Sequence, residues 1–207
     1  MKNIEYFINK EKEFKTSHPN VLELIYDEQC KEFVHESYPD GFLLKGMFEH
    51  FASSKPSQEM KIAIQSYNLT DVEVLILRGF LGNMSQYFRN DYFKIGEVPE
   101  VAKEMQKVLD SIIRKAPVHN GGVVYRFLND YDKSVLKVGD IITIDHSLTT
   151  TTDDWNQDCN VYVVNPLSKE LTSAHDLYKI VNHGNENQVN FIKGTLFLCI
   201  GSRRRYV

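Results

Sequence analysis

The chain has 207 residues, of which 42% are hydrophobic and 12% aromatic, so it can bury a substantial core and is not compositionally disordered. Its net charge of −4 and its pI near 6.0 exclude a global electrostatic attraction to nucleic acid or to an anionic membrane. No run reaches the roughly 20 apolar residues that a membrane span needs, and the N-terminus lacks an apolar leader segment. We therefore expect a cytoplasmic protein that binds no membrane.

The first 115 residues or so carry a mainly helical pattern. Helices are predicted over 4–16, 21–37, 41–52, 57–66 and 71–90, and a further helix is predicted to begin at Pro99. In that last helix Val101, Met105, Val108 and Ile112 recur at helical spacing. Arg78-Gly79 is interpreted as a helix end. We expect residues 1–118 to form a mainly helical N-terminal region.

After Gly121-Gly122 the sequence pattern changes from helical to short β-rich runs. Strands are predicted over 123–128, 141–144, 161–164, 189–192 and 195–200, which makes residues 119–207 a β-rich core, continuous with the helical region or separate from it. Helices followed by strands favour an α+β architecture over a doubly wound parallel sheet. There is no G-x-G-x-x-G segment after a strand and no P-loop sequence, which argues against a Rossmann domain or a P-loop.

The cysteines and histidines do not form a recognisable metal-binding pattern. The three cysteines, at 30, 159 and 199, are odd in number and far apart, which suits a reducing cytosol better than a disulfide framework or a zinc site. His146 and His175 also lack a ligand spacing. We expect no bound metal.

Three polar segments lie on or beside the predicted strands in a fixed order. They are Val-Val-Tyr-Arg at 123–126, Leu-Thr-Thr-Thr at 148–151 and Glu-Asn-Gln-Val at 186–189. Arg126 follows an apolar run, so its guanidinium needs a partner, either a structural carboxylate or a bound anion such as phosphate. A threonine run taken alone is typical of any β-strand.

The order of these segments resembles the arginine, Ser-Thr-Ser and Glu-x-Glu signature of mono-ADP-ribosyltransferases, which split NAD and transfer its ADP-ribose. The chain looks most similar to bacteriophage members and to bacterial toxin or phage-defence members. The resemblance covers roughly residues 120–200 and implies a split β-sheet core with a helical region packed on it. It also implies NAD as a substrate: Arg126 would hold the NAD phosphates and ribose, the Phe127 backbone would hold the nicotinamide amide, and Thr149 and Thr151 would orient and support the catalytic group.

Gln188 stands where the resemblance places the catalytic glutamate, and Glu186 takes the first glutamate position. A fixed anion at 188 would stabilise the positive charge that grows on the ribose as the bond to nicotinamide loosens. Glutamine keeps the shape and an acceptor oxygen but removes the charge, so we expect NAD binding with transfer reduced by roughly 10²-fold or more. The glutamine is either a natural departure or an engineered Glu→Gln change. Phe127 also departs from the family, in which this residue is often glycine.

The acceptor is expected to be a macromolecule. In the resembling family a glutamate at the position of Glu186 goes with guanidinium acceptors, so protein arginine is the first expectation, and a toxin of this kind is compatible with a neutralising partner protein. One alternative is transfer to RNA or DNA, gripped by Arg203, Arg204, Arg205 and Tyr178. A second alternative, from another class, is a non-catalytic nucleotide-binding module.

Overall fold

The computed structural model describes residues 3–17, 55–82, 100–128, 136–155 and 161–201. The chain divides into two compact units, Met1–Ile112 and Ile113–Val207, which are described separately below. The helices predicted over 21–37 and 41–52, the part of 71–90 beyond residue 82, and the cysteines at 30 and 159 lie outside the described residues.

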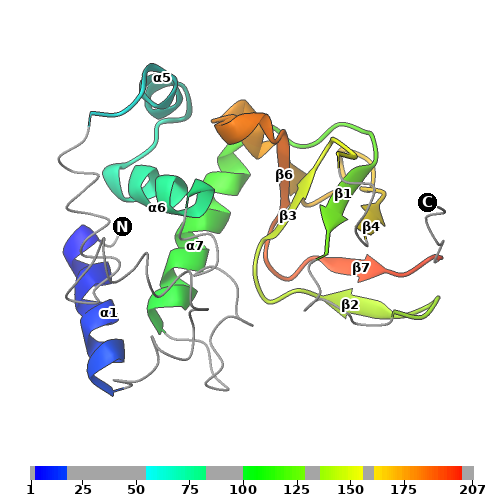
Figure 1. The fold of residues 1–207 in the computed structure, drawn as a ribbon, viewed down its shortest axis with the longest axis horizontal. Coiled ribbons are helices and arrows are strands. Elements are labelled where there is room, and N and C mark those ends of the chain that lie inside the picture. The colour runs from blue at the N-terminus through cyan, green and yellow to red at the C-terminus, as the bar shows by residue number, and fades with distance from the viewer. Residues whose placement is uncertain (1–2, 18–54, 83–99, 129–135, 156–160, 202–207) are drawn as a thin grey trace. The chain divides into compact units, whose positions relative to one another are not determined.

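The first unit is helical (Figure 1). It contains α1 (Ile4–Ser17), α5 (Gln58–Tyr67), α6 (Asp71–Leu81) and most of α7 (Glu100–Lys115). The helices predicted in these regions are confirmed, except that the one predicted over 71–90 ends at Leu81. A capping box begins α6, because the Thr70 hydroxyl accepts from the Glu73 N–H while the Glu73 carboxylate accepts from the Thr70 N–H. None of the described helices combines the length and the apolar character that a membrane span requires.

The helix end predicted at Arg78-Gly79 is wrong. Helix α6 continues to Leu81, and the N–H of Gly82 closes its last turn on the Gly79 carbonyl. Burial of Ile76, Leu77 and Phe80 explains the extension, because the apolar packing of this face outweighs the weak helix propensity of one glycine.

The second unit is built on two antiparallel sheets (Figure 1). The larger sheet contains β1 (Val124–Phe127), β3 (Leu148–Thr151), β4 (Val161–Val164), β5 (Ala174–His175) and β6 (Gln188–Phe191), in the order β4-β1-β3-β6-β5. The smaller sheet pairs β2 (Ile141–Thr143) with β7 (Leu196–Leu198), and short 3₁₀ turns η3 (Leu177–Lys179) and η4 (His183–Asn185) lie between β5 and β6. The α+β fold class is confirmed. Strands β3 and β5 lie outside the predicted strand ranges, and β5 has only two residues, too few to show a period.

One face of the larger sheet carries the apolar core of this unit. The buried side chains of that core are Val124, Leu148, Ala174, Val189 and Phe191. Phe197 of β7 packs edge-on against Phe191 with ring centroids 5.1 Å apart, so the smaller sheet lies against this face. Side chains alternate along a strand, and the residues between these apolar ones therefore belong to the opposite face.

A hydrogen bond and an ion pair that share the buried Asp176 carboxylate anchor the connection that enters β1. The ring Nδ1 of His119 lies 2.6 Å from Oδ1 of Asp176, both side chains are buried, and Lys179 Nζ contacts the other Asp176 oxygen. That contact raises the pKa of Lys179. Backbone bonds from His119 to Ala174 and from Asp176 to Pro117 close the junction. The entry to β1 is thus held at several points.

Replacing Asp176 with alanine should lower the free energy of unfolding by about 2 kcal/mol, because it leaves a buried His119 N–H without its acceptor. Urea unfolding measures this loss. Asp140→Ala is the matched control, since the Asp140 carboxylate is exposed and accepts a local backbone N–H from Lys137. Equal losses in the two variants would show that the His119 contact adds nothing to stability.

Candidate functional site

The three polar segments found in the sequence lie on three neighbouring strands. Arg126 is on β1, Thr149 and Thr151 are on β3, and Gln188 begins β6, while β3 pairs with both of the other strands (Figure 1). The tertiary fold therefore brings together segments that are distant in the sequence.

The strand register shows which of these side chains share a face. Thr151 lies opposite Gln188 on one side and opposite Tyr125 on the other, and Thr149 lies opposite Asn190. Directly opposed residues of antiparallel strands project from the same face. Thr149, Thr151 and Gln188 therefore share the face away from the apolar core.

Thr150 projects from the core face instead. Its hydroxyl donates to the Val189 carbonyl at 2.6 Å, and the side chain is buried. Within the threonine run, the alternation of the strand thus separates Thr150 from its two neighbours.

The loop before β6 has an unusual and well-bonded backbone. Gly184, Asn185 and Asn187 all have positive φ angles, of 65°, 57° and 46°, a region that glycine and asparagine tolerate better than other residues. The Asn187 side chain donates to Asp153 at 2.8 Å, and its backbone N–H donates to the Asn182 side chain. Such strained backbone often marks functional sites.

Glu186 is held at the rim of this loop. The Thr151 hydroxyl donates to its carbonyl oxygen at 2.6 Å, and its exposed side-chain carboxylate accepts from Gln188 Nε2 at 2.6 Å. A hydrogen bond from an amide to a carboxylate is charge-assisted and short, as observed here. The two candidate catalytic residues are therefore in direct contact.

Gln188 also has an acceptor that is not satisfied within the described chain. Its Oε1 atom is buried and forms no hydrogen bond with any residue that the structure describes. Leaving a buried polar atom unpaired costs about 1–3 kcal/mol. A donor group of a bound molecule would remove that cost.

Arg126 occupies a different position from the other predicted site residues. Alternation along β1 places it on the core face with Val124, opposite Tyr162 of β4. Its Nη1 nevertheless reaches the Thr149 carbonyl at 3.5 Å, at the point where the β1–β3 pairing recorded at Tyr125 and Thr151 ends. The guanidinium is thus next to the Thr149 backbone but on the other side of the sheet from its hydroxyl.

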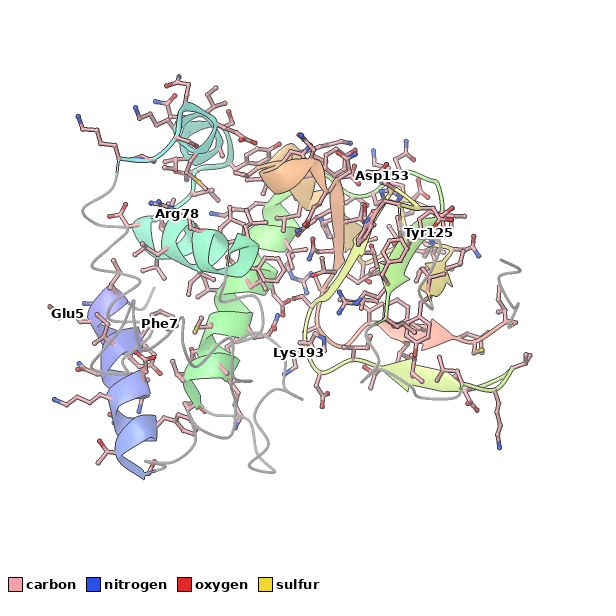
Figure 2. The ribbon with its side chains drawn as sticks, in the orientation of Figure 1. Glu5, Phe7, Arg78, Tyr125, Asp153 and Lys193 are labelled. Carbon is pink, nitrogen blue, oxygen red and sulfur yellow. The ribbon has the colours of Figure 1, made fainter. Side chains whose placement is uncertain are left out.

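Phe127 contacts an exposed aromatic residue. Its ring centroid lies 4.5 Å from that of Trp155, whose side chain is 65% exposed. Figure 2 labels Tyr125 and Asp153 in this strand-rich unit, and Tyr125 is paired with Thr151, two residues before Asp153. A pair of aromatic rings, tilted by 46° to each other, therefore borders the polar face.

Asn190 is a residue of this face that the sequence analysis missed. It is 0% exposed, and its Nδ2 donates to the Thr149 hydroxyl at 3.1 Å. An asparagine within the apolar run Val189–Ile192 was the available signal, since asparagine is depleted in strands.

The described residues include no group of three or more His, Cys, Asp or Glu side chains placed to hold a metal ion.

Comparisons with known proteins find likeness only at the level of solved structures. No protein-family model matches this sequence, and no curated protein sequence matches it significantly. The ADP-ribosyltransferase Vis in complex with the M6 inhibitor is similar at 16% identity and a TM-score of 0.49, covering 76% of this chain and 84% of that one. Another structure of Vis gives its source as Vibrio splendidus.

Two further solved structures have comparable values. Plx2a, an ADP-ribosyltransferase toxin from Paenibacillus larvae, has 15% identity and a TM-score of 0.46, covering 66% of this chain and 80% of that one. The type III effector XopAI from Xanthomonas axonopodis pv. citri has 17% identity and a TM-score of 0.49, covering 92% and 79%. Likenesses of this size do not assign a family or an activity.

Proposed function

We propose that this protein is an NAD-dependent mono-ADP-ribosyltransferase that releases nicotinamide and transfers ADP-ribose to a macromolecule, with protein arginine as the first candidate acceptor. One observation carries the proposal. Thr149 and Thr151 are far from Gln188 in the sequence, yet the three side chains share one face of two paired strands. Glu186, in the loop that enters β6, contacts Thr151 and Gln188. These are the residues that the sequence resemblance assigns to the reacting end of NAD.

The reaction explains why each of these groups would be used. The bond between ribose C1′ and the nicotinamide nitrogen breaks, its electron pair leaves with nicotinamide, and positive charge grows on the ribose. The acceptor nitrogen then bonds to C1′ and gives up a proton. The exposed carboxylate of Glu186 is suited to take that proton, and it is oriented by the hydrogen bond from Gln188.

The site residues also fit the polar groups of NAD. The buried Oε1 of Gln188, which lacks a donor within the described chain, would accept a hydrogen bond from a ribose hydroxyl. The exposed Trp155 ring, which packs against Phe127, offers an aromatic face for the nicotinamide ring. We assign the NAD phosphates to Arg126, because a guanidinium matches phosphate geometry and its Nη1 reaches the Thr149 carbonyl. Since Arg126 projects from the face opposite to that of Thr149, Thr151 and Gln188, this assignment requires NAD to pass around the end of the β1–β3 pairing.

We infer that Gln188, compared with a glutamate at this position, lowers the rate of ADP-ribose transfer without weakening NAD binding. An amide keeps an acceptor oxygen for the ribose but supplies no negative charge to the transition state. The same glutamine favours a second candidate function, a non-catalytic module that recognises a nucleotide.

We further infer that the protein acts in the cytoplasm as a toxin or as a bacteriophage or phage-defence enzyme. A neutralising partner protein is expected to accompany it.

Transfer to RNA or DNA is the remaining alternative. Tyr178 is half-buried and packs against the apolar core cluster of its unit, which makes it a poor candidate for stacking on a base. Arg203, Arg204 and Arg205 lie outside the described residues. Protein is therefore the acceptor class that we test first.

NAD binding by the unchanged protein is the direct test, measured by isothermal titration calorimetry. Arg126→Lys should weaken binding about tenfold, because lysine cannot form the two-pronged contact with phosphate. Arg114→Lys is the matched control, since Arg114 is exposed in the last turn of α7. Absence of heat with the unchanged protein, under conditions where it is folded, would contradict the proposal.

The acceptor class is then found by labelling a bacterial lysate with NAD that carries a labelled ADP-ribose, using the Gln188→Glu variant. Label removed by protease would support a protein acceptor, and label removed by nuclease would support the RNA or DNA alternative. Nucleic-acid binding should in addition weaken steeply as salt is raised.

A further inference from the structure

Asn190 occupies a position where a strand residue would ordinarily be apolar. It lies in the interior of β6 between Val189 and Phe191, both of which are buried, and its own side chain is 0% exposed. Burying an amide is costly unless its hydrogen bonds are made, yet the Asn190 Oδ1 atom has no partner among the described residues. Positions that depart from the rule that buried polar atoms are hydrogen-bonded tend to be functional or strained.

Among the described residues, the side-chain hydrogen bond of Asn190 is directed at Thr149. In the register, Asn190 lies opposite Thr149 on one side and opposite His175 on the other. Its Nδ2 donates to Thr149 Oγ1 at 3.1 Å, while His175 Nδ1 is occupied by the Ala116 carbonyl at 2.9 Å. Asn190 is therefore the neighbour that determines whether the Thr149 hydroxyl donates or accepts a hydrogen bond.

The direction of that bond has a chemical consequence. A threonine hydroxyl has one proton to donate and can accept with its lone pairs. Since Asn190 donates to the oxygen of Thr149, the hydroxyl proton of Thr149 stays available to another acceptor. The same face also presents the buried Gln188 Oε1, which lacks a donor within the described chain. A donor and an acceptor thus project from adjacent strands.

We propose that Asn190 is a positioning residue that makes Thr149 a hydrogen-bond donor, and that Thr149 and Gln188 together bind a ligand with neighbouring hydroxyl groups. A ribose diol has this chemistry, because each hydroxyl both donates and accepts. The assignment rests on the proposed function, since it names Asn190 as an additional determinant of how the same site binds the ribose of NAD.

Asn190→Asp tests the hydrogen-bond direction with almost no change of shape. An ionised aspartate has no N–H, so the Thr149 hydroxyl must donate to it, and the proton is then lost to the ligand. Burial would raise the pKa of this carboxyl, and its protonated form could still donate, so binding is measured from neutral to alkaline pH. We expect NAD binding about tenfold weaker than that of the unchanged protein. Thr149→Val should weaken binding to a similar extent, because it removes the same donor.

The double variant separates a positioning role from a structural one. If Asn190 acts through Thr149, then Asn190→Asp combined with Thr149→Val should bind NAD no more weakly than Thr149→Val alone. Independent effects would multiply to roughly a hundredfold. Thr150→Val is the matched control, because it removes a buried hydroxyl from the core face of the same strand and should leave the dissociation constant unchanged. Urea unfolding confirms that each variant is folded at the temperature of the binding experiment.

The outcomes distinguish this inference from the function on which it rests. NAD binding by the unchanged protein, weakened by Asn190→Asp and not weakened further in the double variant, supports both. Binding by the unchanged protein that Asn190→Asp leaves intact, or effects that multiply in the double variant, overturns the role of Asn190 alone. Absence of NAD binding by the unchanged protein overturns the proposed function and this inference with it.

Discussion

Replacing Gln188 with glutamate should raise the rate of nicotinamide release and of ADP-ribose transfer by roughly 10²-fold or more. The side chain lies at the start of β6, opposite Thr151 and on the same face as Thr149, where a fixed negative charge would stabilise a positively charged ribose in the transition state. Nicotinamide release and incorporation of labelled ADP-ribose are the two measurements. Gln188→Leu is the control, since it also removes the amide but adds no charge.

The contact with Glu186 gives this variant a characteristic pH dependence. Gln188 Nε2 now donates to Glu186 at 2.6 Å, and glutamate at 188 would place two carboxyl groups in that contact. Like charges at this distance resist joint ionisation, so one of the two pKa values rises above the ordinary value of about 4.3. Activity should therefore be lost on acidification at a higher pH than for an isolated glutamate.

Stability should depend on pH in the opposite sense. A carboxyl whose pKa is raised in the folded state favours folding while it is protonated, and this contribution is lost as pH rises from the unfolded pKa through the folded one. The Gln188→Glu variant should thus lose stability relative to the unchanged protein on going from acidic to neutral pH.

The activity prediction has a clear contrary outcome. A folded, NAD-binding Gln188→Glu variant that stays as inactive as Gln188→Leu would indicate a non-catalytic nucleotide-binding module.

In the Gln188→Glu background, replacing Glu186 with glutamine should reduce transfer to a protein acceptor by roughly 10²-fold while nicotinamide release to water persists. Glu186 is exposed at the rim of the loop before β6, where an acceptor would approach, and glutamine cannot take up the acceptor's proton. The ratio of labelled protein to released nicotinamide is the quantity to measure, because it isolates the transfer step from cleavage of NAD.

Glu170→Gln is the matched control for this second variant, since Glu170 is an exposed carboxylate of the same unit outside the strands of the site. The control should leave the ratio unchanged. If Glu186→Gln lowered nicotinamide release as much as transfer, then Glu186 would act in NAD cleavage itself, and the division of roles between positions 186 and 188 would be wrong.

Much of the helical unit could be predicted from local patterns. The apolar spacing that includes Val101, Met105 and Ile112 predicts α7, and the Thr70–Glu73 capping box marks the start of α6. The end of α6 was not predictable in the same way. Burial of Phe80 extends the helix beyond Gly79, and burial is decided by packing rather than by the local propensity of a glycine.

The candidate site also has features that the sequence shows and features that only the folded chain shows. The order of residues is enough to show which residue types are present, that they follow strand-forming runs, and that a neutral glutamine stands at 188. Only the folded chain shows that Thr149 and Thr151 share a face with Gln188, that Arg126 projects from the other face, and that Asn190 contacts Thr149. Strand register causes the difference, since a shift of one residue would exchange the two faces of a strand, and pairing between distant segments sets that register.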